Sequence, residues 1–115
     1  MSVISGIALS ALRSLDKKME TTANNIANAN TDGFKRDRVE FQETYPQGVK
    51  VTLSKPDEPG AVVVDDISGE FKETSNVSLE EEMVDLITTP LQYKLDLEVL
   101  KTEDEMLQSL IDIKA

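Results

Sequence analysis

The 115-residue sequence contains no cysteine, no histidine and no tryptophan. Disulfides and thiol chemistry are therefore excluded, as is acid–base catalysis by an imidazole. Carboxylate pairs remain, but Asp65–Asp66 and Asp104–Glu105 are sequence neighbours, and neighbouring side chains diverge in a strand or a helix. The sequence also shows no glycine-rich phosphate loop and no metal-ligand spacing. We therefore expect no enzyme activity, no cofactor and no bound metal.

Long apolar runs and excess positive charge are also missing. No segment approaches the roughly 18 apolar residues of a membrane span, and the N-terminus lacks the pattern of a secretory signal. The chain has 22 acidic and 12 basic residues, a net charge of −10, whereas binding to nucleic acid needs Lys and Arg to neutralise phosphates. We expect no membrane insertion, no cleavable signal peptide and no nucleic-acid partner.

Two segments carry apolar residues at alternating steps of four and three, which places them on one face of a helix. The first helix is predicted from about Val3 to Asn28 with Ser2 as its cap, and the second begins at a capping box formed by Ser78 and Glu81. This spacing is typical of a coiled coil, so we expect an antiparallel coiled-coil pair of long terminal helices. The two stripes are Ala8, Leu12, Leu15, Met19, Thr22, Ile26 and Ala29, and Leu79, Met83, Leu86, Pro90, Tyr93, Leu97, Leu100, Asp104, Leu107 and Ile111.

Pro90 and Asp104 interrupt the second stripe. A proline inside a helix removes a hydrogen bond and costs about 3 kcal/mol. The helix should therefore either kink at residues 88–90 or restart at Pro90 with Thr89 as its cap. We favour a kink or short break, because the stripe keeps its phase through it. An acid within a seam more often fixes the register of two helices than performs chemistry, and we assign that role to Asp104.

The middle of the chain lacks helical periodicity. Val49, Val51 and Leu53 alternate with polar residues, as in a half-buried strand, and residues 61–64 form a β-branched run. A Pro- and Gly-containing break separates the two, so we expect them to pair as a β-hairpin. Residues 69–75 should be a polar link to the second helix.

These elements define the fold class as α+β in one structural domain. Residues 1–33 form the N-terminal helix and an Asn-rich turn, residues 34–75 the variable β-hairpin segment, and residues 76–115 the C-terminal helix, kinked or broken near Pro90. A self-contained helical hairpin would explain the two stripes. The C-terminal helix, however, has more apolar surface off its seam than one partner helix covers, so further partners are needed. The off-seam residues are Val84, Ile87, Leu91, Leu95, Val99, Met106, Leu110 and Ile113.

Both ends of the chain also carry recognisable signatures. At the N-terminal end the signature comprises Ala23, Asn24, Asn25, Ile26, Ala27, Asn28, Ala29, Asn30, Thr31, Gly33 and Phe34. At the C-terminal end it comprises Ser75, Asn76, Val77, Leu79, Glu81, Glu82, Met83, Val84, Leu86, Ile87, Tyr93, Val99, Lys101, Thr102, Asp104, Glu105, Met106, Leu107 and Leu110. Together they resemble the rod and hook family of bacterial flagellar axial proteins. The short middle segment is most similar to the proximal rod proteins, especially the C type.

This resemblance implies a structural subunit of the flagellar basal-body rod, which self-assembles through its terminal axial helices and transmits torque for motility. Its implied partners are copies of itself, other rod and axial proteins, and the flagellar type III export apparatus. Its implied location is the periplasmic rod, reached without a cleavable signal peptide. The implied assembly interface is Leu12, Leu15, Met19, Ile26, Ala29, Met83, Leu86, Tyr93, Leu97, Leu100, Leu107 and Ile111.

The sequence departs from that family at two places on the second helix. Pro90–Leu91 stands where rod proteins usually carry Gln-Arg, and Asp96 stands where they usually carry asparagine. These departures leave a second function open, that of a soluble acidic helical adaptor or regulator derived from the axial fold, which binds one helical partner in a groove.

Overall fold

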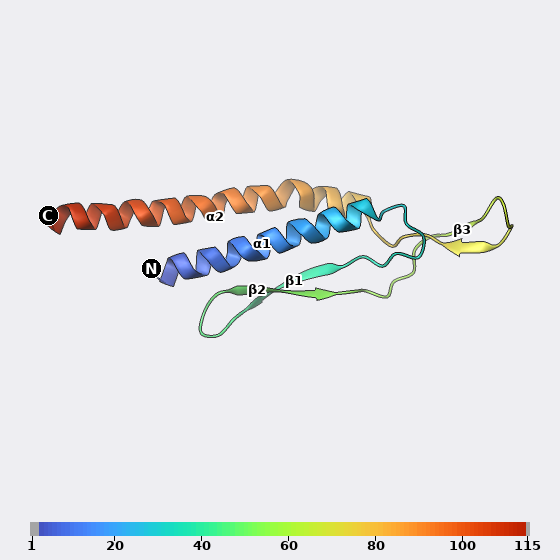
Figure 1. Cartoon of the computed structure of the whole chain (residues 1–115), viewed down its shortest axis with the longest axis horizontal. Coiled ribbons are helices and arrows are strands. Elements are labelled where there is room, and N and C mark those ends of the chain that lie inside the picture. The colour runs from blue at the N-terminus through green and yellow to red at the C-terminus, as the bar shows by residue number, and fades with distance from the viewer. Residues whose placement is uncertain (1–2, 115) are drawn as a thin grey trace.

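The computed structural model describes residues 3–114, and the expected cap Ser2 lies outside them. The elements in chain order are helix α1 (Val3–Ala27), strands β1 (Arg38–Glu43), β2 (Val49–Ser54), β3 (Val62–Val64) and β4 (Phe71–Glu73), and helix α2 (Leu79–Lys114). The molecule is a long thin body of 79 × 26 × 13 Å. The two helices run antiparallel, which confirms the predicted α+β fold with a paired set of terminal helices (Figure 1).

Helix α1 lies between α2 and the β1–β2 hairpin (Figure 1). The small core is centred on it, because Ala8, Leu12 and Leu15 are its buried apolar residues. Two serines of α1 face the hairpin instead: the Ser10 hydroxyl accepts a hydrogen bond from the Val49 amide at 3.0 Å, and the Ser14 hydroxyl donates to the Val49 carbonyl at 3.3 Å. The four-and-three spacing of the first stripe therefore marks the face of α1 that packs inward.

The chain leaves α1 through the Asn-rich turn and reverses at Gly33. Gly33 has a φ of 72°, a backbone conformation that side chains with a Cβ rarely adopt. In this conformation the Gly33 amide donates to the Glu73 carbonyl at 2.9 Å. The turn is therefore tied directly to strand β4, and the two ends of the middle segment meet beside the end of α1.

The predicted pairing of the strands is wrong. Strand β2 pairs with β1 in register Phe41↔Val51, and β3 pairs with β4 in register Val63↔Lys72, both antiparallel. The segment from Lys55 to Gly60 contains two prolines and keeps the chain extended, so it does not reverse the chain between β2 and β3. Residues 69–75, expected to be a polar link, include strand β4.

Helix α2 begins as the capping box predicted. The Ser78 hydroxyl accepts from the Glu81 amide at 3.5 Å, and the Ser78 carbonyl accepts from the Glu82 amide at 3.0 Å. The helix then continues through Pro90 to Lys114, so the alternative of a second helix starting at Pro90 is wrong. Figure 1 shows only a gentle bend in the N-terminal third of α2, which is how a long helix accommodates one lost hydrogen bond.

Within residues 3–114, no helix combines the length and the apolar character needed to cross a membrane.

Candidate assembly interface

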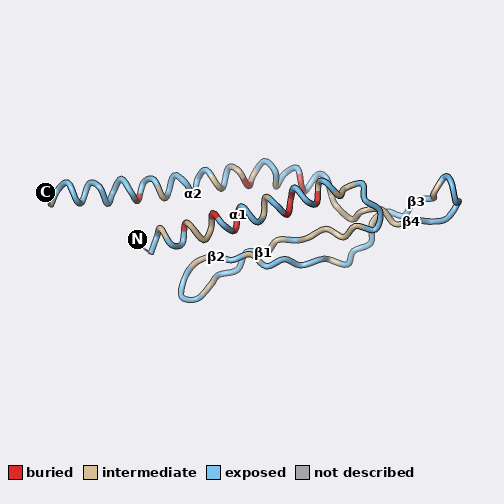
Figure 2. Tube along the Cα trace, in the orientation of Figure 1, coloured by how far each residue is buried: buried red, intermediate tan, exposed pale blue. Residues whose placement is uncertain are grey.

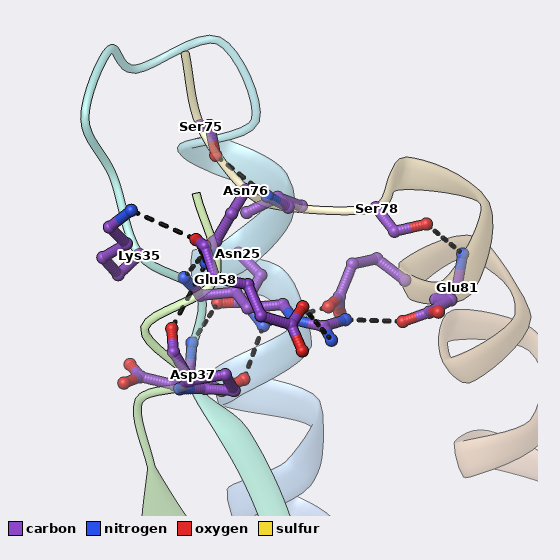
Figure 3. Close-up of polar contacts among 12 residues, drawn as sticks. Asn25, Lys35, Asp37, Glu58, Ser75, Asn76, Ser78 and Glu81 are labelled. Carbon is purple, nitrogen blue, oxygen red and sulfur yellow. Dashed lines mark hydrogen bonds and ion pairs between the residues drawn. The ribbon is translucent and has the colours of Figure 1, made fainter. Parts of the chain in front are cut away.

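Asn25 joins three elements where α1 ends and α2 begins. Its side chain is 1% exposed. The Asn25 Nδ2 donates to the Asp37 carbonyl at 2.9 Å, the Asn25 Oδ1 accepts from the Asp37 amide at 3.1 Å, and Nδ2 also donates to Glu82 Oε1 at 3.1 Å. The side-chain amide thus pairs with the backbone of residue 37 as a neighbouring strand would, and it fixes the start of α2 at the same time (Figure 3).

Asn76 likewise bonds the backbone of two other segments, at Arg36 and at Glu58. Its Oδ1 accepts from the Arg36 amide at 2.6 Å, and its Nδ2 donates to the Glu58 carbonyl at 2.9 Å. The Arg36 guanidinium bridges Glu81 of α2 at 2.5 Å and Glu58 at 3.7 Å (Figure 3). Because both glutamates are largely exposed, these ion pairs contribute little compared with the two asparagines.

Lys18 of α1 is half-buried between α2 and the β1–β2 hairpin. Its ammonium lies 3.7 Å from Asp85 of α2 and 5.6 Å from the centre of the Phe41 ring. It therefore contacts the second helix and the β1–β2 hairpin from α1. A polar hollow of about 480 Å³ opens beside it, lined by Thr22, Arg36, Glu82 and their neighbours. In the part of the chain that the structure describes, no group of three potential metal ligands occurs.

The most buried residues on the face of α2 that meets α1 are polar. Glu82, Thr89 and Glu103 are buried there, and Asp96 is half-buried, at a constant spacing of seven residues. We call these four residues the polar ladder. Three atoms of the ladder, Thr89 Oγ1, Asp96 Oδ2 and Glu103 Oε1, are buried without a hydrogen-bond partner. Burying unpaired polar atoms costs stability.

Burial changes the acidity of two ladder residues. Desolvation raises the pKa of Glu82, although the hydrogen bond from Asn25 opposes the shift, and desolvation alone raises the pKa of Asp96. Away from the helices, the hydrogen bond from the Ile67 amide lowers the pKa of Asp65, and the Lys35 ammonium lowers that of Glu73. Protonation of Glu82 and Asp96 therefore favours the folded state, whereas protonation of Asp65 and Glu73 opposes it.

We expect the fold to become more stable as the pH falls from neutral toward about 5. A carboxyl group whose pKa is higher in the folded state contributes stability that is complete below the unfolded pKa and lost as pH rises through the folded pKa. Below about pH 4 the trend should reverse, because Asp65 and Glu73 then gain protons.

Asp96→Asn should raise the free energy of unfolding at pH 7 by about 1 kcal/mol and flatten the pH dependence. Urea unfolding at several pH values measures both, with the exposed acid Asp104→Asn as control; a steeper slope in Asp96→Asn would contradict the expectation.

Only part of the seam predicted on α2 is covered by α1. Tyr93 and Leu100 are half-buried, whereas Met83, Leu97 and Asp104 are exposed. Asp104 therefore does not lie between the helices, and the register role assigned to it is wrong. On α1, Leu12 and Leu15 are buried, and Met19, Ile26 and Ala29 are half-buried. The remaining members of the expected interface are exposed, namely Leu86, Leu107 and Ile111.

Most residues of α2 are exposed (Figure 2), and many of its large apolar side chains are among them. Ile87 is 66% exposed, Leu95 68% and Ile113 81%. An apolar groove of about 620 Å³ runs along its C-terminal half, lined by Ile4, Leu95, Val99, Met106 and Leu110 among others. An exposed apolar surface of this extent is typical of a protein–protein contact. The geometry therefore describes an incompletely covered helix pair with no recognisable reaction centre among its described residues.

The comparisons with known proteins agree with this geometry. Residues 7–35 match the model of the family described as "Flagella basal body rod protein". Residues 69–113 match the family described as "Flagellar basal body rod FlgEFG protein C-terminal". The chain belongs to the flagellar rod and hook family. The two matched segments of this axial protein contain most of α1, the Asn-rich turn and nearly all of α2, and neither covers residues 36–68.

One curated relative is the "Flagellar hook protein FlgE" of Treponema pallidum (strain Nichols). It is 38% identical over 61 residues, which make up 53% of this chain and 13% of the hook protein. The axial protein described here thus corresponds to a small part of that relative. Together the matches support a structural flagellar axial subunit.

The structure gives the signature residues unequal roles. Asn25 and Asn76 hydrogen-bond the backbone of other segments, whereas Asn24, Ala27 and Asn30 are exposed. The inward position of Glu82, Thr89 and Glu103 was missed by the sequence analysis. Their seven-residue spacing was a usable signal, but acids at such spacing usually indicate a solvated helix face.

Proposed function

We propose that this axial protein is a subunit of the bacterial flagellar basal-body rod that self-assembles through its terminal helices and transmits torque for motility. The observation that carries the proposal is that both family signatures fold into one helix pair whose second helix leaves its apolar side chains uncovered on the sides away from α1. An exposed apolar surface of this extent usually marks a protein–protein contact. Neighbouring subunits supply the missing cover.

The length of the middle segment supports a rod subunit over a hook subunit. Only residues 36–68 lie between the two matched segments, and they contain the β1–β2 hairpin and strand β3 rather than a further domain. We therefore place the protein in the proximal rod, as a subunit similar to the C type, with copies of itself and other axial proteins as neighbours. Export through the flagellar type III apparatus to the periplasm, without a cleavable signal peptide, follows from this proposal.

The assembly interface that we propose combines the predicted stripes with the outer face of α2. Leu12, Leu15, Met19, Ile26 and Ala29 support it from within the helix pair. Met83, Leu86, Leu97, Leu107 and Ile111 are largely exposed and meet other subunits directly, while Tyr93 and Leu100 lie at the border between the two. Contacts that join unlike surfaces of identical subunits produce an open, helical array when the rotation between subunits does not close into a ring.

A deletion strain complemented with this chain tests the proposal. We expect the deletion to abolish swimming and to leave incomplete basal bodies in electron micrographs, and the intact chain to restore both. Intact flagella with altered expression of flagellar genes would instead favour the adaptor alternative. Pro90–Leu91, the feature that raised that alternative, lies inside a continuous helix and gives it no structural support.

A further inference from the structure

The stripe of α2 that faces α1 is not the most apolar one available. The observed contact and the predicted seam share Tyr93 and Leu100, which are half-buried and lie seven residues apart. They differ in the row of residues beside these two, which also repeats every seven residues. In the structure this inner row is the polar ladder. In the predicted seam it is Met83, Pro90, Leu97 and Asp104. A rotation of α2 about its own axis by roughly 50° exchanges the two rows, since successive residues are about 100° apart.

Hydrophobic burial alone would choose the other row. Met83 is 54% exposed and Leu97 44% exposed, while the acids of the ladder lie inside. Each buried Leu or Met side chain contributes favourably, whereas unpaired buried polar atoms oppose folding. A specific interaction must therefore hold α2 in the observed rotation.

Two hydrogen bonds across the helix pair provide that interaction, one near each end of α1. At the junction, Asn25 Nδ2 donates to Glu82. At the open end, the Ser5 hydroxyl donates to Glu103. Glu82 and Glu103 are three seven-residue steps apart, so both acceptors lie on one face of α2, and both bonds form only when that face meets α1.

We propose that the polar ladder is a positioning element, which sets the rotation of α2 against α1 and keeps Met83 and Leu97 on the outside. That a neighbouring subunit meets these two side chains rests on the proposed function; the rotation itself does not. Polar residues inside a helix seam select one register at a cost in stability. The ladder does so here by excluding the more apolar arrangement.

Single cysteines can report the rotation, because the chain has none of its own. Thr89→Cys places a thiol on the inner row, where the native hydroxyl makes no hydrogen bond, and Leu97→Cys places one on the outer row. In dilute monomeric protein we expect a maleimide to modify Cys at position 97 at least about tenfold faster than at position 89, since only the outer row is open to solvent. Equal rates would overturn the proposal.

The ladder is then removed by combining Glu82→Met, Asp96→Met and Glu103→Met. We expect a higher melting temperature and a difference between the two labelling rates that shrinks to about threefold or less, because α2 now occupies both rotations. The matched control combines Glu82→Gln, Asp96→Asn and Glu103→Gln, which keeps both hydrogen-bond acceptors and should keep the full difference. A full difference in the methionine variant would overturn the proposal.

A milder variant covers the case in which the triple substitution does not fold. Ser5→Ala with Glu103→Met removes the hydrogen bond at the open end and leaves the one between Asn25 and Glu82 in place. We expect the labelling of Asp104→Cys to slow severalfold as that end of α2 turns, and an unchanged rate would overturn the proposal. All these measurements use the monomer, so a failure of self-assembly would count against the proposed function and leave this inference standing.

Discussion

Replacing Asn25 with alanine is expected to lower the free energy of unfolding by about 2–4 kcal/mol, because it leaves buried hydrogen-bonding groups without partners. The substitution removes three hydrogen bonds at once, two to the backbone of Asp37 and one to Glu82. The buried carboxylate of Glu82 also loses the hydrogen bond that partly offsets the cost of its burial. In a domain of this size such a loss should lower the melting temperature by about 10 °C or more.

Asn24→Ala is the matched control for this prediction. Asn24 belongs to the same sequence motif, but it is exposed, and its side-chain oxygen only accepts from Asn28 Nδ2 at 3.3 Å within the same helix. We expect a loss of about 0.5 kcal/mol or less, as for other surface positions. Chemical denaturation followed by circular dichroism compares the two variants. Equal midpoints would show that the junction does not depend on Asn25.

Leu95→Lys combined with Met106→Lys is expected to abolish swimming while leaving the monomer folded. Both side chains line the apolar groove of α2 and are more than 60% exposed in the monomer, so the helix pair does not depend on them. In the assembled rod each should contribute about 1.5–3 kcal/mol by burial. Losing both should raise the concentration needed for self-association by about 100-fold or more.

The control for this pair adds the same charge without removing apolar surface. Gln92→Lys with Gln108→Lys changes two exposed positions of the same helix and should leave swimming largely intact. Sedimentation measures self-association, motility plates measure swimming, and thermal unfolding verifies the monomer. Normal swimming by the Leu95→Lys, Met106→Lys variant would show that the outer face of α2 is not an assembly surface.

Features that depend on neighbouring residues can be predicted from this sequence, whereas features that depend on distant residues cannot. Helix α1 was predicted to within a residue or two, since its apolar spacing and the Asn-Asp-Gly turn act over a few neighbours. The start of α2 was predicted for the same reason. Strand pairing failed because β1 has only Val39 and Phe41 as apolar alternation, and because pairing depends on which segments meet in space rather than on any local pattern.

The candidate site was predictable only as a set of residues that share a face. The signatures contain Asn25 and Asn76 but do not reveal their partners. Asn25 accepts from the Asp37 amide, 12 residues away in the sequence. Asn76 accepts from the Arg36 amide, 40 residues away. Asp104 was assigned the register role because it lies in phase with an apolar stripe. The structure shows it exposed, and the inward acids are those of the polar ladder.

The sequence by itself determined that the chain ends in two long helices, that it carries no histidine or cysteine chemistry, and that its apolar surface exceeds what one helix pair covers. Each of these depends on composition or on spacing along one segment. The rotation of α2 was decided only by the tertiary structure. The apolar residues of α2 lie on several sides of the helix, so their spacing selects no single face. Only the tertiary structure shows that the hydrogen bonds from Asn25 and Ser5 turn the face of Glu82 and Glu103 toward α1.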